Sequence, residues 1–262
     1  MSMPVIPLLL AAGLIQYDAN AHFGDVATNR ARLTVLADEA VDRGAGMVVF
    51  PEGSTLGYVG EGETWCSAGR DTCGEWRCRD VTPVAESLPG GPTTAYWASY
   101  ARGRNVHVVY SVIEASGGHF YDSVGVVGPS GFVTGYRKRI LYGPDDCYAE
   151  PGTSPATFDI GGEKMGLLIC ADVNSDDFLA AYRASGVAHV VLPMDWDQSP
   201  TGDRAAKAVV SEKAQANGVL IDVADLPAWD GTGRYLPEGG PRLRPGLPED
   251  GVGVEGVTVV GP

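Results

Sequence analysis

Short apolar runs recur along the chain and alternate with segments in which apolar residues return at helical spacing. Residues 47–50 form such a run without polar alternation, which is typical of a strand buried on both faces. Residues 25–43 have helical spacing, with Asp25 as a candidate cap and Gly44 as the stop. The alternation of the two patterns predicts an α/β protein.

The remaining chain gives further elements of both kinds. We predict strands at residues 8–17, 106–114, 120–128, 132–137, 156–160, 164–169, 188–193, 219–224 and 252–260, and helices at residues 92–104, 176–185 and 203–216. Hairpin turns beside strand–helix units indicate one mixed sheet, or two sheets with helices outside. We expect a single domain over residues 1–262, with a cysteine-containing insertion at residues 53–92 and an atypical Gly/Pro-rich C-terminus at residues 227–262. The insertion and residues 227–251 are expected to be irregular.

Charge and hydropathy exclude several classes of partner. The chain has 33 acidic and 19 basic residues, a net charge of −14, and an acidic surface repels nucleic acid. The longest apolar run, residues 5–15, is interrupted by Pro7 and Gly13 and is too short to span a membrane. It also has no basic segment before it and no cleavage-site pattern after it. We therefore expect a cytoplasmic protein with no nucleic-acid or membrane partner.

The chain has five cysteines. An odd number without a signal pattern argues against a complete disulfide framework and indicates at least one free thiol. Cys66, Cys73 and Cys78 are seven and five residues apart, which is not a usual zinc pattern. For these three we expect ordinary packing in an ordered insertion, rather than a metal site or one local disulfide.

Three reactive side chains each follow a predicted strand. Glu52 comes after residues 48–50, Lys138 after residues 132–137 and Cys170 after residues 165–169. Ligands bind at the carboxyl ends of strands in open α/β architectures, so these side chains are expected to converge there. Taken singly, each has a plainer explanation, as a surface turn residue, a solvated strand end or a buried structural thiol.

The three residue types form a coherent chemical set. A thiol attacks a carbonyl or nitrile carbon once it has lost its proton. No histidine lies near these strand ends, so the carboxylate of Glu52 is the candidate base. Lys138 is expected to lower the pKa of the Cys170 thiol and to offset the negative charge of the transition state. No step requires a metal or a cofactor, and we expect none.

Three blocks of the chain resemble those of the nitrilase superfamily of carbon–nitrogen hydrolases. They read Val49-Phe50-Pro51-Glu52, Gly135-Tyr136-Arg137-Lys138-Arg139 and Gly166-Leu167-Leu168-Ile169-Cys170-Ala171-Asp172, and their order and spacing also fit. The resemblance runs from about residue 8 to residue 224 and implies a four-layer αββα sandwich that forms a homodimer or higher homo-oligomer. It implies metal-free hydrolysis of a small-molecule amide, nitrile or carbamoyl compound. The oxyanion hole would comprise Lys138 and the backbone N–H of Ala171.

The chain also departs from the family pattern. Asp145 stands where many members have a second glutamate, and its shorter side chain puts that role in doubt. The arginine that often follows the cysteine block is missing, which weakens the case for a carbamoyl amino acid. Substrate-pocket candidates, some of which could equally be packing residues, are Tyr58, Trp65, Asn174 and Trp196.

The sequence therefore predicts a thiol-dependent amidase or nitrilase, with an amide favoured over a nitrile. Two alternatives remain open. A biosynthetic acyl or amide transferase could use the same residues, passing the acyl group to an amine instead of water. A non-catalytic binding or scaffold protein could also retain the triad.

Overall fold

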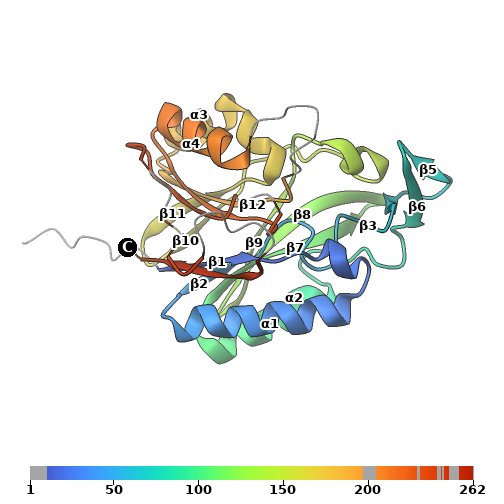
Figure 1. Ribbon diagram of the computed structural model, residues 1–262, viewed down its shortest axis with the longest axis horizontal. Helices are drawn as coiled ribbons and strands as arrows, with labels where there is room; N and C mark the ends of the chain where they lie inside the picture. The colour runs from blue at the N-terminus through green and yellow to red at the C-terminus, as the bar shows by residue number, and fades with distance from the viewer. Residues whose placement is uncertain are drawn as a thin grey trace, which may run out of the picture.

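The computed structural model describes residues 11–196, 205–228, 231–240, 243, 245–247 and 254–261. Two sheets lie face to face, and a pair of helices covers the outer face of each (Figure 1). The helices are α1 (Val26–Asp42), α2 (Pro92–Arg104), α3 (Asp176–Ala184) and α4 (Ala206–Asn217). In Figure 1, α1 and α2 lie below the sheets and α3 and α4 above them. The expected four-layer αββα sandwich is confirmed.

The first sheet has the strand order β15-β1-β2-β7-β8-β9. Its strands are β1 (Ala12–Gln16), β2 (Met47–Val49), β7 (His107–Ser116), β8 (His119–Gly128), β9 (Gly131–Arg137) and β15 (Gly256–Val260). β1, β2 and β7 are parallel, whereas β7, β8 and β9 form an antiparallel meander. β9 therefore runs in the same direction as β2, and the two strands end at the same edge of the sheet.

The second sheet has the order β10-β11-β12-β13-β14. Its strands are β10 (Thr157–Ile160), β11 (Glu163–Leu167), β12 (His189–Pro193), β13 (Leu220–Ala224) and β14 (Gly233–Tyr235). The three central strands are parallel, and an antiparallel strand closes each edge. β14 lies in a stretch expected to be loop. Arg234 on this strand makes two hydrogen bonds of 2.7 Å to the buried carboxylate of Asp222, which holds the short strand in register.

The helix ends follow the local sequence signals. Asp25 caps α1, its side chain accepting a hydrogen bond from the N–H of Thr28 at 3.0 Å. α2 begins at Pro92 and ends before Asn105, which adopts the left-handed conformation typical of a helix C-terminus. Ser175 caps α3. These three helices match their predicted positions to within one residue at either end.

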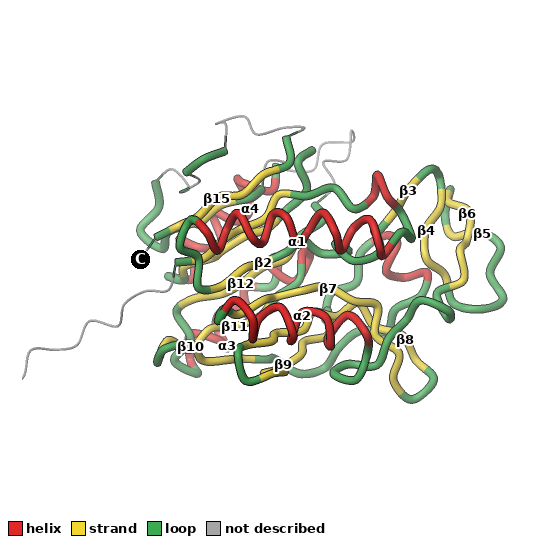
Figure 2. Tube along the Cα trace, turned by 90° about the horizontal axis from the view of Figure 1, so that it is seen from below, coloured by secondary structure: helices red, strands yellow, loops and turns green. Residues whose placement is uncertain are grey.

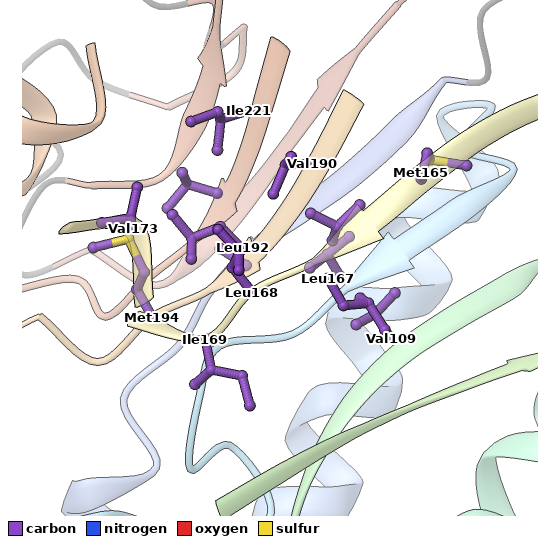
Figure 3. Close-up of a cluster of buried hydrophobic side chains, with 14 of the residues drawn as sticks. Val109, Met165, Leu167, Leu168, Ile169, Val173, Val190, Leu192, Met194 and Ile221 are labelled. Atoms are coloured by element: carbon purple, nitrogen blue, oxygen red, sulfur yellow. The ribbon is translucent and has the colours of Figure 1, made fainter. Parts of the chain in front are cut away.

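The main apolar cluster lies between the two sheets and extends under α3 and α4. Figure 3 shows Val109 of the first sheet beside Met165 and Leu167 of the second, with Val190 and Ile221 further along the second sheet. A second cluster lies under α1 and α2, which run side by side across the outer face of the first sheet (Figure 2). Burying each large apolar side chain contributes about 1.5–3 kcal/mol. The two clusters therefore hold the four layers together.

Residues 53–92 are ordered into a small third sheet, contrary to the expectation of an irregular segment. Its strands, in the order β3-β4-β6-β5, are β3 (Val59–Gly60), β4 (Glu63–Cys66), β5 (Thr72–Cys73) and β6 (Trp76–Asp80). This sheet projects from one end of the sandwich (Figure 2). Two of the strands are only two residues long and have no detectable period, which is why the pattern analysis missed them.

Four of the five cysteines form disulfides, so the expectation of ordinary packing was wrong. Cys66 pairs with Cys78, and Cys73 pairs with Cys147. Cys170 is the free cysteine, which confirms the expected free thiol. The odd count misled because it is compatible with two complete pairs beside one free thiol. The second pair joins residues 74 positions apart, which sequence spacing alone does not reveal.

The remaining expectations concern the chain ends and the helices. β15 confirms the last predicted strand, although residues 252–253 lie outside the described residues. Residues 8–10 of the first predicted strand also lie outside the described residues, as do residues 203–204 of the fourth predicted helix. In the part of the chain that the structure describes, no helix is both long enough and apolar enough to cross a membrane.

Candidate active site

The residues predicted to be reactive lie where strands of the two facing sheets end. Glu52 lies three residues beyond β2, and Lys138 directly follows β9 in the same sheet. Cys170 lies three residues beyond β11 in the second sheet. The exposed fractions of the three residues are 2%, 1% and 5%, so the site is enclosed by protein. The expected convergence therefore brings both sheets to one buried site.

Lys138 forms the electrostatic centre of this site. Its Nζ lies 2.6 Å from Glu52 Oε1, 2.5 Å from Asp145 Oδ2 and 3.6 Å from Asp122 Oδ2. Burial by itself would lower the pKa of Lys138, but the carboxylates of Asp145 and Glu52 raise it well above its ordinary value. The lysine is therefore a charged ammonium held by carboxylates on several sides.

Asp145 occupies the position expected for the second glutamate of the family and reaches the lysine despite its shorter side chain. It lies in the 3₁₀ helix η2 (Gly143–Cys147) and also accepts a hydrogen bond from the N–H of Tyr142 at 3.0 Å. Burial raises the pKa of Asp145, and the nearby charge of Glu52 adds to the rise while Lys138 opposes it. The position of η2 close to Lys138 makes up for the shorter reach of an aspartate side chain.

Oxygen atoms of Glu52, Asp122 and Asp145 lie within 4.8 Å of one another, a spacing that could suit a cation. The Lys138 ammonium already lies within 3.6 Å of all three carboxylates. A second cation would be repelled by it at this range. The donor set therefore fits a lysine better than a resident metal ion, and the metal-free expectation stays a prediction.

The backbone of Asp195 links the candidate base to the candidate nucleophile. Its N–H donates to Glu52 Oε2 at 2.8 Å, and its carbonyl oxygen lies 3.7 Å from Cys170 Sγ, which donates to it. Because Glu52 Oε1 accepts from Lys138, each oxygen of the carboxylate has a donor. This arrangement fixes the orientation of Glu52 beside the thiol.

Cys170 lies in a strained backbone conformation at the start of the 3₁₀ helix η3 (Cys170–Asn174). Its φ angle is 41°, in the left-handed region of backbone conformation that residues other than glycine rarely adopt. Such strain costs of the order of 1–3 kcal/mol and persists only where surrounding contacts fix the chain. The turn is therefore held in place by its neighbours.

Asp172 supplies those contacts. Its Oδ2 accepts the N–H of Ile169 at 3.1 Å and the hydroxyl of Tyr136 at 2.7 Å. Its Oδ1 accepts the N–H groups of Arg139 at 3.1 Å and Ile140 at 2.7 Å. One buried carboxylate thereby joins the turn that carries Cys170 to the segment that follows Lys138.

The thiol of Cys170 is not activated in the way that we expected. Burial raises its pKa well above the ordinary value, Glu52 raises it further, and Lys138 lowers it by less than these two effects. The expectation that Lys138 sets a low thiol pKa is therefore wrong. A protonated thiol needs a base during attack, which makes the position of Glu52 more important.

Three of the minor candidates lie beside this machinery. The Tyr58 ring centre is 5.5 Å from Lys138 Nζ, and its hydroxyl donates to the carbonyl of Tyr142 at 2.8 Å. Ala171 directly follows Cys170 in η3 and is buried, and its N–H remains a proposed oxyanion donor. The side chain of Asn174 donates to the carbonyl of Ala171 at 3.1 Å, so it closes the turn.

The two tryptophan candidates have different surroundings. Trp65 is fully buried in a cluster of the inserted sheet, packs on Phe23 and donates its indole N–H to the carbonyl of Gly57 at 2.9 Å. Packing, the alternative weighed for it, therefore describes Trp65 best. Trp196 lies next to Asp195, and its backbone N–H donates to Asp225 at 3.2 Å. Its position beside the Cys170–Asp195 contact keeps it a pocket candidate.

Sequence reasoning missed Asp122 and Asp195. Asp195 follows β12, so it could have been found as a fourth polar residue beyond the end of a strand. Asp122 lies within β8, where an acid in a largely apolar run was the available signal. Burial raises the pKa of Asp122 well above its ordinary value, with Glu52 contributing.

Comparison with known proteins agrees with this geometry. Residues 11–220 match the model of the carbon–nitrogen hydrolase family. The chain therefore belongs to the carbon–nitrogen hydrolase family. Over 172 residues it is 33% identical to a nitrilase of Pyrococcus abyssi, covering 63% of this chain and 60% of that protein. Over 195 residues it is 31% identical to an (R)-stereoselective amidase of Pseudomonas sp., covering 74% of this chain and 63% of that protein.

The chain thus spans about three fifths of the length of these two relatives. Among solved structures, it resembles an amidase from Nesterenkonia sp. with a TM-score of 0.75 and 19% identity, covering 99% of this chain and 93% of that one. At this identity the likeness concerns the fold alone.

Proposed function

We propose that the protein is a thiol-dependent hydrolase of a non-peptide C–N bond, with an amide favoured over a nitrile. The observation that carries the proposal is the linkage around Glu52. One of its oxygens accepts a hydrogen bond from Lys138 at 2.6 Å, and the other accepts one from the N–H of Asp195. The carbonyl oxygen of Asp195 in turn accepts a hydrogen bond from the Cys170 thiol. Base, cation and nucleophile are thus held by one set of contacts. The nitrilase and amidase relatives support the same reaction class.

In the proposed acylation step, Glu52 takes the proton of the Cys170 thiol as the sulfur attacks the substrate carbonyl carbon. Negative charge develops on the carbonyl oxygen, where the Lys138 ammonium and the N–H of Ala171 stabilise it. Glu52 then gives the proton to the leaving nitrogen. Ammonia or an amine departs, and a thioester remains on Cys170.

The deacylation step repeats this sequence with water. Glu52 removes a proton from a water molecule, and the hydroxide attacks the thioester carbon. The oxyanion again forms beside Lys138. Collapse expels the thiolate, which recovers its proton from Glu52, and a carboxylic acid leaves. One base therefore serves both half-reactions, and no metal or cofactor enters either.

The buried acids around the candidate nucleophile favour a substrate without a carboxylate. Asp225 is fully buried, accepts from the N–H of Trp196 and contributes to the raised pKa of Cys170. Asp195 is also buried, and its carboxylate accepts from the side chain of Asn20 at 3.0 Å. Burial raises the pKa of both carboxyl groups, and neither group supplies a positive charge, so burying a substrate carboxylate beside them would cost free energy. Small neutral amides are therefore the first substrates to test, and structures of the Nesterenkonia amidase contain acrylamide and butyramide.

Intact-mass spectrometry with a panel of neutral amides and nitriles tests the proposal. The expected result is release of ammonia together with a transient adduct on Cys170. Cys170→Ala should lose both while keeping the native circular dichroism spectrum. Added hydroxylamine would divert the acyl group of a transferase to a hydroxamate faster than water takes it. Neither adduct nor product with any member of the panel would favour the binding or scaffold alternative.

Two further expectations remain proposals. A homodimer or higher homo-oligomer is tested by light scattering on the purified protein. The cytoplasmic location predicted from the sequence has a counterargument in the two disulfides, because reducing systems keep most cytosolic thiols unpaired. Mass measurement of free thiols in protein taken from its native compartment addresses that point.

A further inference from the structure

The inserted sheet is fastened to the active site by one of its two disulfides. Cys66 and Cys78 lie on the neighbouring strands β4 and β6, 12 residues apart, so their bond stays within the insert. Cys73 on β5 instead reaches Cys147, the last residue of η2. Only the second bond therefore joins the insert to another part of the fold.

η2 is the segment that presents Asp145 to the lysine. Asp145 is two positions before Cys147, is fully buried, and lies 2.5 Å from Lys138 Nζ. The carbonyl of Asp145 also accepts the N–H groups of Tyr148 at 3.1 Å and Ala149 at 2.7 Å. Because these contacts make η2 a tight turn, a shift at Cys147 would be passed to the carboxylate of Asp145.

The other polar contacts between the insert and η2 are few and partly exposed. The N–H of Ser67 donates to the carbonyl of Cys147 at 3.1 Å, and the exposed Arg70 donates to the carbonyl of Asp146 at 3.0 Å. Tyr58 donates to the carbonyl of Tyr142, just before η2, at 2.8 Å. Hydrogen bonds of this kind are individually weak, because water competes for both the donor and the acceptor. The covalent bond is the firm part of this attachment.

We propose that the Cys73–Cys147 disulfide is a positioning device for the lysine site. The disulfide holds η2 so that Asp145 keeps its contact with Lys138. Reduction of the disulfide therefore lowers the kcat of the enzyme. The proposal rests on the hydrolase activity proposed above. Reduction by a dithiol breaks the S–S bond, the two sulfurs take up two electrons and two protons, and the dithiol closes to its own disulfide. Misplacement of a catalytic group by about 1 Å can cost 10²-fold in rate, so a modest movement of η2 suffices.

The two disulfides provide matched variants for the test. Cys73→Ser/Cys147→Ser removes the bond to η2, and Cys66→Ser/Cys78→Ser removes the bond within the insert. We expect the first variant to lose about tenfold or more in kcat with little change in KM, because the affected group acts on the reaction centre. The second should keep kcat within about twofold. Dithiothreitol should lower the kcat of wild type and of Cys66→Ser/Cys78→Ser, but not that of Cys73→Ser/Cys147→Ser.

Hydrogen exchange gives a readout that does not depend on turnover. Amides of residues 143–149 should exchange faster in Cys73→Ser/Cys147→Ser and in reduced wild type, while β11 and β12 remain protected. Should no form hydrolyse any substrate, the proposed function fails, and this measurement still decides the role of the disulfide. Wild-type kcat and unchanged exchange in Cys73→Ser/Cys147→Ser would overturn the proposal. Equal losses in both double variants would also overturn it, because the effect would then belong to the insert as a whole.

Discussion

The carboxylate of Asp172 accepts the backbone N–H of Ile140 at 2.7 Å, which ties the turn that carries the candidate nucleophile Cys170 to the segment that follows Lys138 in the other half of the sandwich. The same carboxylate accepts the N–H of Ile169, directly before Cys170. The distance between the candidate nucleophile and Lys138 therefore depends on a residue that is not assigned a role in the proposed reaction.

Asp172→Asn should impair activity through position alone. The amide keeps the size of the carboxylate but has one acceptor oxygen, so at least one of the backbone or hydroxyl donors loses its partner. We expect a loss of stability of about 1–3 kcal/mol and a fall in kcat of about tenfold or more. Urea unfolding and steady-state kinetics measure the two effects. Asp177→Asn, at an exposed site in α3, is the matched control and should change neither.

Lys138→Ala should lower kcat by about 10²-fold or more, the scale for losing an oxyanion donor. Lys138→Arg should recover little, because a planar guanidinium does not fit a buried space where the ammonium contacts Glu52 and Asp145 at 2.6 and 2.5 Å. Circular dichroism establishes that the variants fold, and Lys164→Ala serves as an exposed control. Near-wild-type kcat in either variant of Lys138 would exclude the proposed role.

Glu52→Gln distinguishes a base from an orienting residue. Glutamine can keep an acceptor toward Lys138 but cannot take the thiol proton, so kcat should fall by about 10²–10⁴-fold. Asp145→Asn should lower kcat by less, since the proposed role of Asp145 is to position Lys138 and not to accept the thiol proton. Single-turnover kinetics with mass detection of the thioester separates acylation from deacylation. A dead Asp145→Asn beside an active Glu52→Gln would make Asp145 the base.

Asp225 predicts a dependence of stability on pH. Burial raises the pKa of its carboxyl to about 7, against about 3.9 in an unfolded chain. The native state therefore holds a proton that the unfolded state has lost, so this contribution to stability is complete below about pH 4 and disappears as pH rises through about 7. Its full size is about 4 kcal/mol as an upper limit.

Urea unfolding of Asp225→Asn at pH 5 and pH 8 tests this prediction. The neutral amide does not titrate, so the variant should lose less stability than wild type between the two pH values. The exposed Asp71→Asn is the control and should follow wild type. Parallel curves for Asp225→Asn and wild type would contradict a raised pKa at this position.

The sequence alone was sufficient for the features that depend on local signals. The helix from Pro92 to Arg104 starts at a proline and stops before a left-handed asparagine, both within a few residues of the ends that they define. Glu52, Lys138 and Cys170 were recognisable as candidates because each lies within three residues of the end of a strand, inside a characteristic sequence block. Short-range order of this kind is encoded by neighbouring residues, so it can be read without knowledge of the fold.

Only the tertiary structure decided the contacts that join distant segments. Asp122 reaches Lys138 from within β8, the backbone of Asp195 joins Glu52 to Cys170, and Cys73 finds its partner 74 positions away. No rule of sequence spacing predicts these pairs. Each forms because the packing of the two sheets brings distant strands and loops together. The resting protonation of Cys170 belongs to the same group, since burial and the nearby Glu52 determine it, and both arise only when the chain folds.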